Sequence, residues 1–351
     1  MPSDLGRTMG VMIFRLASDA DERSTAELFA QLRHEGLSLY PVLRDGVQWY
    51  ATSTLDPGSR EKLQHSSLVT SWFETPAGYQ LTSRSFQSAN TVVSFEDLSF
   101  GDGSVQVIAG PCAVESLELA VQMAGILRSE GLVFFRGGLF KPRTSPYSFQ
   151  GLGERGIPIL KEIKERFGLR IVVEVLDERS LELLEPVADL MQVGSRNMQN
   201  FALLKILGGA RKPILLKRGM AATIEELLLA AEYIAVHGNP RIILCERGIR
   251  TAATHSRNTL DLSVIPILKQ ETHLPVIVDP SHGTGRDNLV RPMARAAIAA
   301  GADGVMVEVH PEPSHALSDG YQSITPDELH LLVDELQKIS AAMGTTLGKR
   351  P

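Results

Sequence analysis

The sequence predicts an α/β protein in which a small α+β module precedes a closed barrel of parallel strands. Beyond residue 104, eight short apolar runs alternate with stretches whose apolar residues recur at helical spacing. Strands joined by crossover helices form parallel sheets, and eight such units in about 240 residues match a (β/α)8 TIM barrel in size. An open doubly wound sheet is the competing architecture. Before residue 86 the predicted order is strand, helix, strand, strand, helix, strand, which is typical of a ferredoxin-like module.

The elements of the first 85 residues follow from local patterns. Residues 10–16 form a short apolar run, and residues 21–35 place apolar side chains on one helical face before Gly36 ends the helix. Arg44-Asp45-Gly46 is a hairpin turn signal between two strands. Residues 86–104 are predicted to be a polar linker, in which a strand within 91–95 closes the bottom of the barrel. The remaining elements are strands at 37–43, 47–52 and 68–73 and a helix at 59–64.

Residues 105–351 are predicted to form the barrel domain. Helical periodicity is clear at 117–127, at 224–233 and at 292–300. No low-complexity segment or short repeat interrupts this region, which favours one barrel over an array. The predicted strands lie at 105–109, 132–136, 171–175, 189–193, 213–217, 241–245, 275–279 and 304–309.

Composition excludes several functions. A hydrophobic content of 43% is ample for a buried core, and a formal charge of -6 argues against a general nucleic-acid or membrane surface. Cys112 and Cys245 are the only cysteines, which is too few for a disulfide framework and fits a reducing compartment. The N-terminus lacks a signal-peptide pattern, and no apolar run reaches membrane-spanning length. We therefore expect a cytoplasmic protein that neither binds nucleic acid nor crosses a membrane.

A barrel carries its active site at the carboxyl ends of its strands, and these ends are strongly polar here. The second strand leads into a cationic loop, 136–145, where two glycines permit close approach of the backbone to a ligand. Such a loop predicts an anionic ligand, and a plain basic surface loop is the alternative. The other strand ends are Gly110-Pro111-Cys112, Glu174, Gly194-Ser195-Arg196-Asn197, Lys217-Arg218, Glu246-Arg247, Asp279-Pro280-Ser281-His282, and Glu308 with His310.

Two groups of residues separate by their chemistry. The first contains one soft, one borderline and two hard donors and suits a divalent transition metal: Cys112, His282, Glu308 and Asp319. Taken alone, Cys112 reads equally well as a small buried hydrophobe and His282 as a histidine that braces a loop. The second group carries enough positive charge for two phosphorylated or carboxylated substrates: Arg136, Lys141, Arg143, Arg196, Lys217 and Arg247.

Two other features predict little function. Residues 151–156, Gly-Leu-Gly-Glu-Arg-Gly, match the dinucleotide-binding pattern, but no predicted strand precedes them. Cys245 lies inside an apolar strand and is interpreted as a core residue, although Glu246 beside it leaves a redox role open.

These motifs resemble those of the 3-deoxy-D-arabino-heptulosonate 7-phosphate (DAHP) synthases, which catalyse the first step of the shikimate pathway, in their type I beta subclass. The resemblance covers about residues 105 to 340 and rests on several long motifs that occur in order. They are Gly110-Pro111-Cys112, Lys141-Pro142-Arg143-Thr144-Ser145, Leu216-Lys217-Arg218-Gly219, Cys245-Glu246-Arg247-Gly248, Asp279-Pro280-Ser281-His282 and Val307-Glu308-Val309-His310-Pro311.

The resemblance implies a metal-dependent, aldol-type condensation of phosphoenolpyruvate with D-erythrose 4-phosphate that releases phosphate, in chorismate and aromatic amino acid biosynthesis. The implied metal is manganese, iron, cobalt or zinc, held by the four donors identified above. Catalysis is implied for Lys141, Cys112 and His282. Contacts to phosphoenolpyruvate are implied for Arg136, Lys141, Glu174, Arg196, Lys217 and Arg247, and contacts to erythrose 4-phosphate for Arg143 and Thr144.

The same resemblance implies a regulatory role for residues 1–85, an aromatic amino acid or prephenate as effector, and a homo-oligomer, expected to be a tetramer. Three other functions remain open. One is a 3-deoxy-D-manno-octulosonate 8-phosphate synthase, although those enzymes carry a different sequence in place of 141–145. The second is a non-catalytic regulatory paralogue that binds ligand. The third is an aldolase that forms a Schiff base on Lys141 or Lys217.

Overall fold

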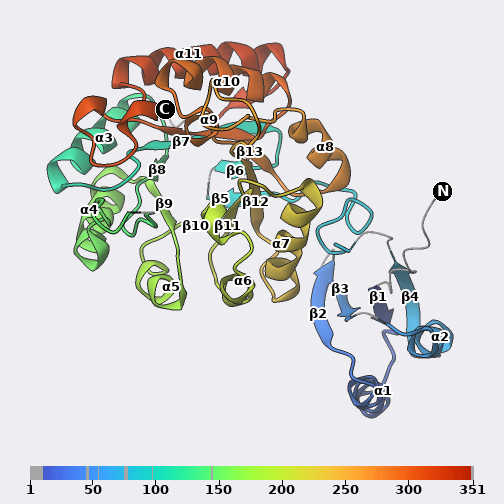
Figure 1. Ribbon diagram of the computed structural model, residues 1–351. Helices are drawn as coiled ribbons and strands as arrows, with labels where there is room; N and C mark the ends of the chain where they lie inside the picture. The colour runs from blue at the N-terminus through green and yellow to red at the C-terminus, as the bar shows by residue number, and fades with distance from the viewer. Residues whose placement is uncertain are drawn as a thin grey trace.

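The computed structural model describes residues 11–44, 47–53, 55–74, 78–96, 98–143 and 145–348. Within these residues the chain forms a small antiparallel sheet with two helices and, beside it, a barrel of parallel strands ringed by helices (Figure 1). In this described part, no helix combines the length and the apolar character needed to cross a membrane.

The N-terminal module has the predicted βαββαβ order. Its sheet has the strand order β2-β3-β1-β4, with β1 antiparallel to both β3 and β4, which is the ferredoxin-like arrangement. Aspartates cap both helices: Asp21 accepts from the Ser24 amide, and Asp56 accepts from the amides that follow it. The turn residues Asp45 and Gly46 lie outside the described residues. The elements are β1 (Met12–Leu16), α1 (Glu22–His34), β2 (Leu39–Arg44), β3 (Val47–Thr52), α2 (Pro57–His65) and β4 (Val69–Glu74).

Eight parallel strands form the closed barrel that the sequence predicts. Each strand pairs with its sequence neighbours, and β14 returns to pair with β7, from Gly304 opposite Gln106 to Glu308 opposite Gly110. Closure excludes the open doubly wound sheet. The strands are β7 (Ser104–Gly110), β8 (Phe134–Arg136), β9 (Arg170–Glu174), β10 (Leu190–Val193), β11 (Ile214–Lys217), β12 (Ile242–Glu246), β13 (Val276–Val278) and β14 (Gly304–Glu308).

The helices around the barrel bury one apolar face against the strands, whose own residues are nearly all buried because both faces of the sheet are covered. Capping boxes at Thr223 and Thr325 begin two of these helices. The helices are α3 (Leu117–Ser129), α4 (Ile157–Phe167), α5 (Glu178–Leu184), α6 (Phe201–Gly208), α7 (Ile224–Val236), α8 (Val264–Glu271), α9 (Pro280–Thr284), α10 (Asp287–Ala299) and α11 (Pro326–Ala342); short 3-10 turns and β15 (Thr346–Leu347) complete the chain.

A hairpin of β5 (Val93–Phe95) and β6 (Leu98–Phe100) closes the amino-terminal end of the barrel, which confirms the strand predicted there. The rings of Phe95 and Phe100 lie 5.1 and 5.2 Å from the ring of Phe134, measured between centroids. Cys245 belongs to the same buried cluster, so its interpretation as a core residue is correct. This apolar filling leaves only the opposite end of the barrel for polar chemistry.

The segment before the hairpin is hydrogen-bonded to the barrel and also packs on the N-terminal sheet, where the rings of Phe86 and Phe73 lie 5.6 Å apart. The Glu232 carboxylate on α7 accepts from the backbone amides of Leu81 and Thr82 at 2.8 and 3.0 Å. His273 bonds the Leu81 carbonyl through Nε2 and the Thr91 hydroxyl through Nδ1, each at 2.7 Å. Residues 79–91 therefore follow the barrel, while the division into domains at 85 and 104 stays a prediction.

The dinucleotide-like segment 151–156 has no strand before it among the described residues 145–150. Gly153–Gly156 forms a 3-10 turn that leads into α4. The structural context of a nucleotide-binding glycine loop is therefore absent there, as the sequence predicts.

Candidate active site

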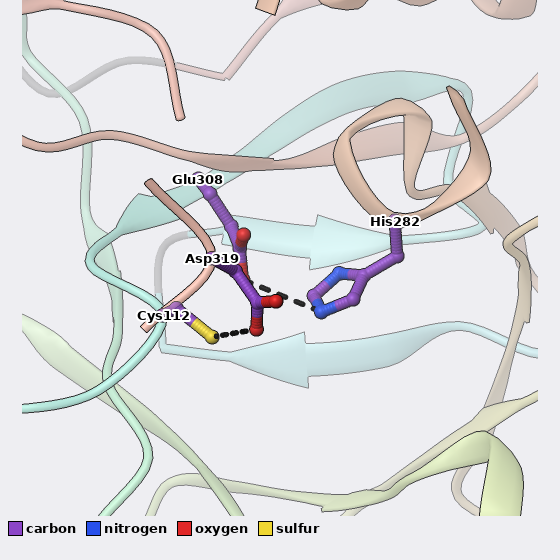
Figure 2. A group of neighbouring side chains, drawn as sticks. All are labelled: Cys112, His282, Glu308 and Asp319. Atoms are coloured by element: carbon purple, nitrogen blue, oxygen red, sulfur yellow. Dashed lines mark hydrogen bonds and ion pairs between the residues drawn. The ribbon is translucent and has the colours of Figure 1, made fainter. Parts of the chain in front are cut away.

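Four side chains converge at the carboxyl end of the barrel from four places in the chain. Cys112 follows β7, His282 lies in the short helix α9 just after β13, and Glu308 is the last residue of β14. Asp319 comes from the loop between β14 and α11, where it adopts a left-handed backbone with φ of 54°. One potential ligand atom from each of the four lies within 4.8 Å of the others (Figure 2). The structure thus brings together the four donors predicted as metal ligands.

The geometry of this cluster fits a metal ion. The Cys112 sulfur is 3.1 Å from Oδ2 of Asp319, and Nε2 of His282 is 3.4 Å from Oε1 of Glu308, as the dashed lines in Figure 2 show. Two carboxylates, a thiol and an imidazole converge here, and a bound cation would offset the negative charge of the carboxylates. A soft sulfur, a borderline nitrogen and hard oxygens together suit a divalent transition metal better than magnesium or calcium.

Neighbouring side chains fix the orientation of these donors. Nδ1 of His282 donates to Oδ2 of Asp279 at 2.8 Å, which leaves Nε2 with its lone pair toward the cluster. Burial lowers the pKa of His282, although Asp279 and Glu308 oppose this, so the neutral ring that a metal requires is favoured. Glu308 accepts from Arg136 at 2.7 Å and from the Gln322 amide at 2.6 Å. His282 and Glu308 are therefore held before a metal binds.

Lys141 lies between the cluster and the open part of the site. Its Nζ is 3.0 Å from both the sulfur and the carbonyl oxygen of Cys112. Burial opposes the charged ammonium, but Cys112 and Glu174 together raise the pKa of Lys141. Burial also raises the pKa of the Cys112 thiol to about 12, and Glu308 adds to this shift. A bound metal ion favours the thiolate.

A cavity of about 320 Å³ opens beside the cluster and contains most of the predicted cations. Lys217 and Arg247 are almost fully buried in its wall, at 3% exposure each. Arg136 does not line it, because its guanidinium is buried against Glu308. Thr144 lies outside the described residues. The predicted residues that do line the cavity are Lys141, Arg143, Glu174, Arg196, Lys217, Arg247, His282 and Asp319.

The sequence reasoning missed several residues of this site. Arg257, from the loop after β12, lines the cavity with its guanidinium 3.8 Å from Asp319, and it donates to Gln322 at 2.9 Å. Asp279 was visible only as part of a strand-end motif. No local signal marks Arg257 or Gln322, because each gains its role from contacts across the fold. Arg218, beside Lys217 in the sequence, instead pairs with Glu246 at 3.0 Å.

The fold and the site define a class: a (β/α)8 barrel enzyme with a metal-ligand cluster next to a cationic cavity for anionic substrates. Residues 87–344 match the model of the DAHP synthetase I family, and the chain belongs to this family. It is 50% identical over 284 residues to a phospho-2-dehydro-3-deoxyheptonate aldolase of Thermotoga maritima, which covers 81% of this chain and 84% of that protein. The metal-dependent character of the family agrees with the cluster.

Solved structures agree with this assignment, and a second group of relatives is more distant. The crystal structure of a Thermotoga maritima DAHP synthase superposes with a TM-score of 0.78 at 43% identity, over 97% of this chain and all of that one. A truncated form of the Thermotoga maritima synthase matches 77% of this chain, with a TM-score of 0.73. A 2-dehydro-3-deoxyphosphooctonate aldolase of Nitrobacter hamburgensis is 32% identical over 72% of this chain and 94% of its own length.

Proposed function

We propose that this protein condenses phosphoenolpyruvate with erythrose 4-phosphate and releases phosphate. The observation that carries the proposal is that the metal-ligand cluster and the buried cations share one cavity. An aldose phosphate offers a carbonyl oxygen to the metal-ligand cluster and an anionic phosphate to the buried cations. Phosphoenolpyruvate adds a carboxylate and a second phosphate, which the remaining cations can balance.

The proposed metal ligands are Cys112, His282, Glu308 and Asp319, and the proposed metal is manganese, iron, cobalt or zinc. When bound there, such an ion would polarise the aldehyde oxygen as a Lewis acid. Lys141 Nζ, next to the Cys112 sulfur, provides positive charge where that oxygen gains negative charge as the enol carbon adds. Water then attacks the resulting cationic carbon, and phosphate leaves.

The proposed substrate contacts divide by position. Lys217, Arg196 and Arg247, with Glu174, line the cavity from the carboxyl ends of β9 to β12 and are assigned to phosphoenolpyruvate, together with Lys141. Arg143, held by the Phe149 carbonyl at 3.1 Å, is assigned with Thr144 to erythrose 4-phosphate. Holding both anions among fixed cations offsets their repulsion and converts their encounter into a positioned reaction. Arg136 is proposed to act indirectly, through Glu308.

Two alternatives can be separated by assay. A 3-deoxy-D-manno-octulosonate 8-phosphate synthase would use arabinose 5-phosphate, but the DAHP-type relative is more similar than the octulosonate relative, at 50% against 32% identity. Phosphate release from phosphoenolpyruvate is expected with erythrose 4-phosphate and far less with arabinose 5-phosphate. Release with neither sugar would support a non-catalytic paralogue, and a preference for arabinose 5-phosphate would overturn the proposal.

A Schiff-base aldolase needs a neutral lysine. The raised pKa of Lys141 favours its charged form, and Lys217 is engaged in a buried ion pair with Asp279. Borohydride treatment with substrate is therefore expected to trap no covalent adduct. A trapped adduct on either lysine would replace the metal mechanism.

Other features belong to the same proposal. Residues 1–85 are proposed as a regulatory domain, 86–104 as a linker and 105–351 as the catalytic domain, and the truncated Thermotoga maritima structure supports a separable barrel. An aromatic amino acid or prephenate is the proposed effector, a homotetramer the proposed assembly, and the cytoplasm the proposed location.

A further inference from the structure

We infer that Glu115 is a positioning residue that holds the loop of residues 311–319 where Asp319 can complete the metal cluster. The inference rests on the proposed metal site. Glu115 follows Cys112 by three residues and directly precedes the Ser116 cap of α3. One of its carboxylate oxygens, Oε1, accepts the backbone N–H of Leu317 at 2.9 Å. The other, Oε2, is 3.8 Å from Nε2 of His310.

These contacts link three of the four metal donors. Leu317 precedes Asp319 by two residues, and His310 follows Glu308 by two. The Glu115 carboxylate therefore bonds the segment that carries Asp319 and faces the side chain of the residue two places after Glu308. The Cys112 segment is itself fixed to the barrel, since the Val114 amide donates to the Gly138 carbonyl at 3.0 Å. Glu115 thus extends from a rigid strand end to a loop.

The 311–319 loop needs such a tether because little apolar burial holds it. The Leu317 side chain is 54% exposed, and Glu312 and His315 are exposed as well. Asp319 adopts a left-handed backbone, with φ of 54°, which aspartate tolerates better than most residues. The Ser318 hydroxyl is 3.2 Å from the Cys112 sulfur, but that contact involves a metal ligand. The hydrogen bond from the Leu317 amide to Glu115 involves none of the four proposed metal ligands.

A hydrogen bond within its own loop determines which ring nitrogen of His310 faces Glu115. Nδ1 of His310 accepts the Glu312 amide at 3.0 Å, so the neutral ring carries its proton on Nε2. The ring is 5% exposed, and among the described residues Nε2 has no direct hydrogen-bond partner; the Glu115 carboxylate oxygen Oε2 lies 3.8 Å from it. A cavity beside them, lined by Glu115, Gln122, His310 and Leu317, admits a bridging water.

Cobalt binding to the full chain tests the inference without relying on turnover. The dissociation constant of Co²⁺ is measured by equilibrium dialysis and by the absorption that cobalt gains from a bound thiolate. Glu115→Ala is expected to weaken Co²⁺ binding about 10- to 100-fold, the usual effect of losing a partner that orients metal ligands. Glu115→Gln keeps an oxygen for the Leu317 amide and is expected to lie between the parent and Glu115→Ala.

A matched control lies at the opposite end of the barrel. Glu185 Oε1 accepts the backbone N–H of Arg211 at 2.8 Å, so Glu185→Ala removes a bond of the same kind far from the cluster. This variant should bind Co²⁺ like the parent. With saturating cobalt, Glu115→Ala should recover turnover with unchanged KM for both substrates, because a bound metal itself holds Asp319 in place.

A double-variant comparison checks that His310 and Glu115 act together. His310→Asn keeps an acceptor for the Glu312 amide but loses the donor toward Glu115. If the two residues form one unit, the double variant with Glu115→Ala binds Co²⁺ about as weakly as the weaker single variant. Multiplicative losses would overturn this pairing. If Glu115→Ala does not fold, Glu115→Gln and His310→Asn decide by the same measurement.

The outcomes separate this inference from the proposed function. Normal Co²⁺ affinity in folded Glu115→Ala, with a parent that binds Co²⁺, would overturn the role of Glu115 and leave the proposed function intact. An equal loss in Glu185→Ala would show a general effect on stability and also overturn it. A parent that binds no Co²⁺ would overturn the metal site and the inference with it.

Discussion

Asp279 and His282 form a buried hydrogen bond of 2.8 Å, from Nδ1 of the ring to Oδ2 of the carboxylate. The same Oδ2 also accepts from Lys217. Burial alone would raise the pKa of Asp279, but His282 and Lys217 hold it well below its usual value. One charged carboxylate therefore connects a metal donor with a cation of the substrate cavity.

Asp279→Asn is expected to lower both metal affinity and turnover about 10- to 100-fold. The amide can still accept the His282 backbone N–H, but it cannot offer a charged acceptor to both His282 and Lys217. Metal dissociation constants and turnover of the purified variant measure the effect. Asp303→Asn is the control. Asp303 accepts from Lys269 and from the amide of Val276, which begins β13, whereas Asp279 follows the end of β13. Equal metal affinity in both variants would contradict this role.

Cys112→Ser is expected to weaken transition-metal binding and nearly abolish activity, because Cys112 is the soft donor of the cluster. Cys245→Ser should keep the metal. Cys245 is fully buried in the barrel interior, so its replacement places a hydroxyl in an apolar site and costs stability, about 1–3 kcal/mol. Metal content, turnover and thermal unfolding of both variants separate the two effects. Near-normal turnover of Cys112→Ser without added metal would show that the ligand assignment is wrong.

The two groups of cations should separate by substrate. Arg143→Ala is expected to raise KM mainly for erythrose 4-phosphate, and Arg247→Ala mainly for phosphoenolpyruvate. Losing one charge-assisted contact in a desolvated site costs roughly 1.5–3 kcal/mol, or about tenfold to a hundredfold in affinity. Steady-state kinetics with each substrate varied in turn provide the test. Equal changes for both substrates in both variants would mean that the assignment fails.

The barrel was predictable because each strand is an apolar run that ends in polar residues. The sequence places the strand before the cationic loop at 132–136, and the structure begins it at Phe134, since Leu132 and Val133 belong to the irregular connection after α3. The four metal donors were also predictable, since Glu308 ends a strand and Cys112 and His282 come within four residues of a strand end. Position at a strand end is a local property, and parallel strands bring such ends together.

The network around the donors was not predictable in the same way. Arg136 is a cation at a strand end, yet its partner is Glu308, 172 residues away, so it braces a ligand instead of lining the cavity. Arg257 reaches Asp319 from a loop without strand or helix. Asp279 reads as a turn residue before proline until Lys217 is seen beside it. These roles depend on distances between segments, which residue patterns do not encode.

Stability should fall on acidification through His273. Burial lowers the pKa of this histidine below its usual 6.5, so the folded protein takes up the proton less readily than the unfolded chain. The contribution of His273 is therefore complete above pH 6.5 and is lost as the pH falls below it. Denaturant unfolding at pH 7.5 and pH 5.5 should show a smaller loss in His273→Gln than in the parent. His255→Gln, at an exposed histidine, should behave like the parent, and identical pH dependence in all three proteins would refute the assignment.

The N-terminal module is expected to be removable, but only if the cut respects the segment that the barrel binds. A protein lacking residues 1–78 keeps Leu81 and Thr82 on Glu232 and the Thr91 contact of His273, so it should fold and remain active. A cut after residue 91 removes the amides that bind Glu232 and the Thr91 hydroxyl that binds His273, and it uncovers the barrel surface on which this segment lies. The shorter protein should therefore unfold at a distinctly lower denaturant concentration.

The same truncation also tests whether the N-terminal module regulates activity. A small domain alters activity only if a ligand prefers one of its arrangements over another, so its removal should abolish the response to that ligand while leaving turnover. Steady-state assays of the full chain and of the protein lacking residues 1–78, each with tyrosine, phenylalanine and prephenate, measure this. We expect at least one compound to inhibit the full chain and none to inhibit the truncated one. Inhibition of both proteins would place the effector site on the barrel, and inhibition of neither would leave the module a structural or assembly element.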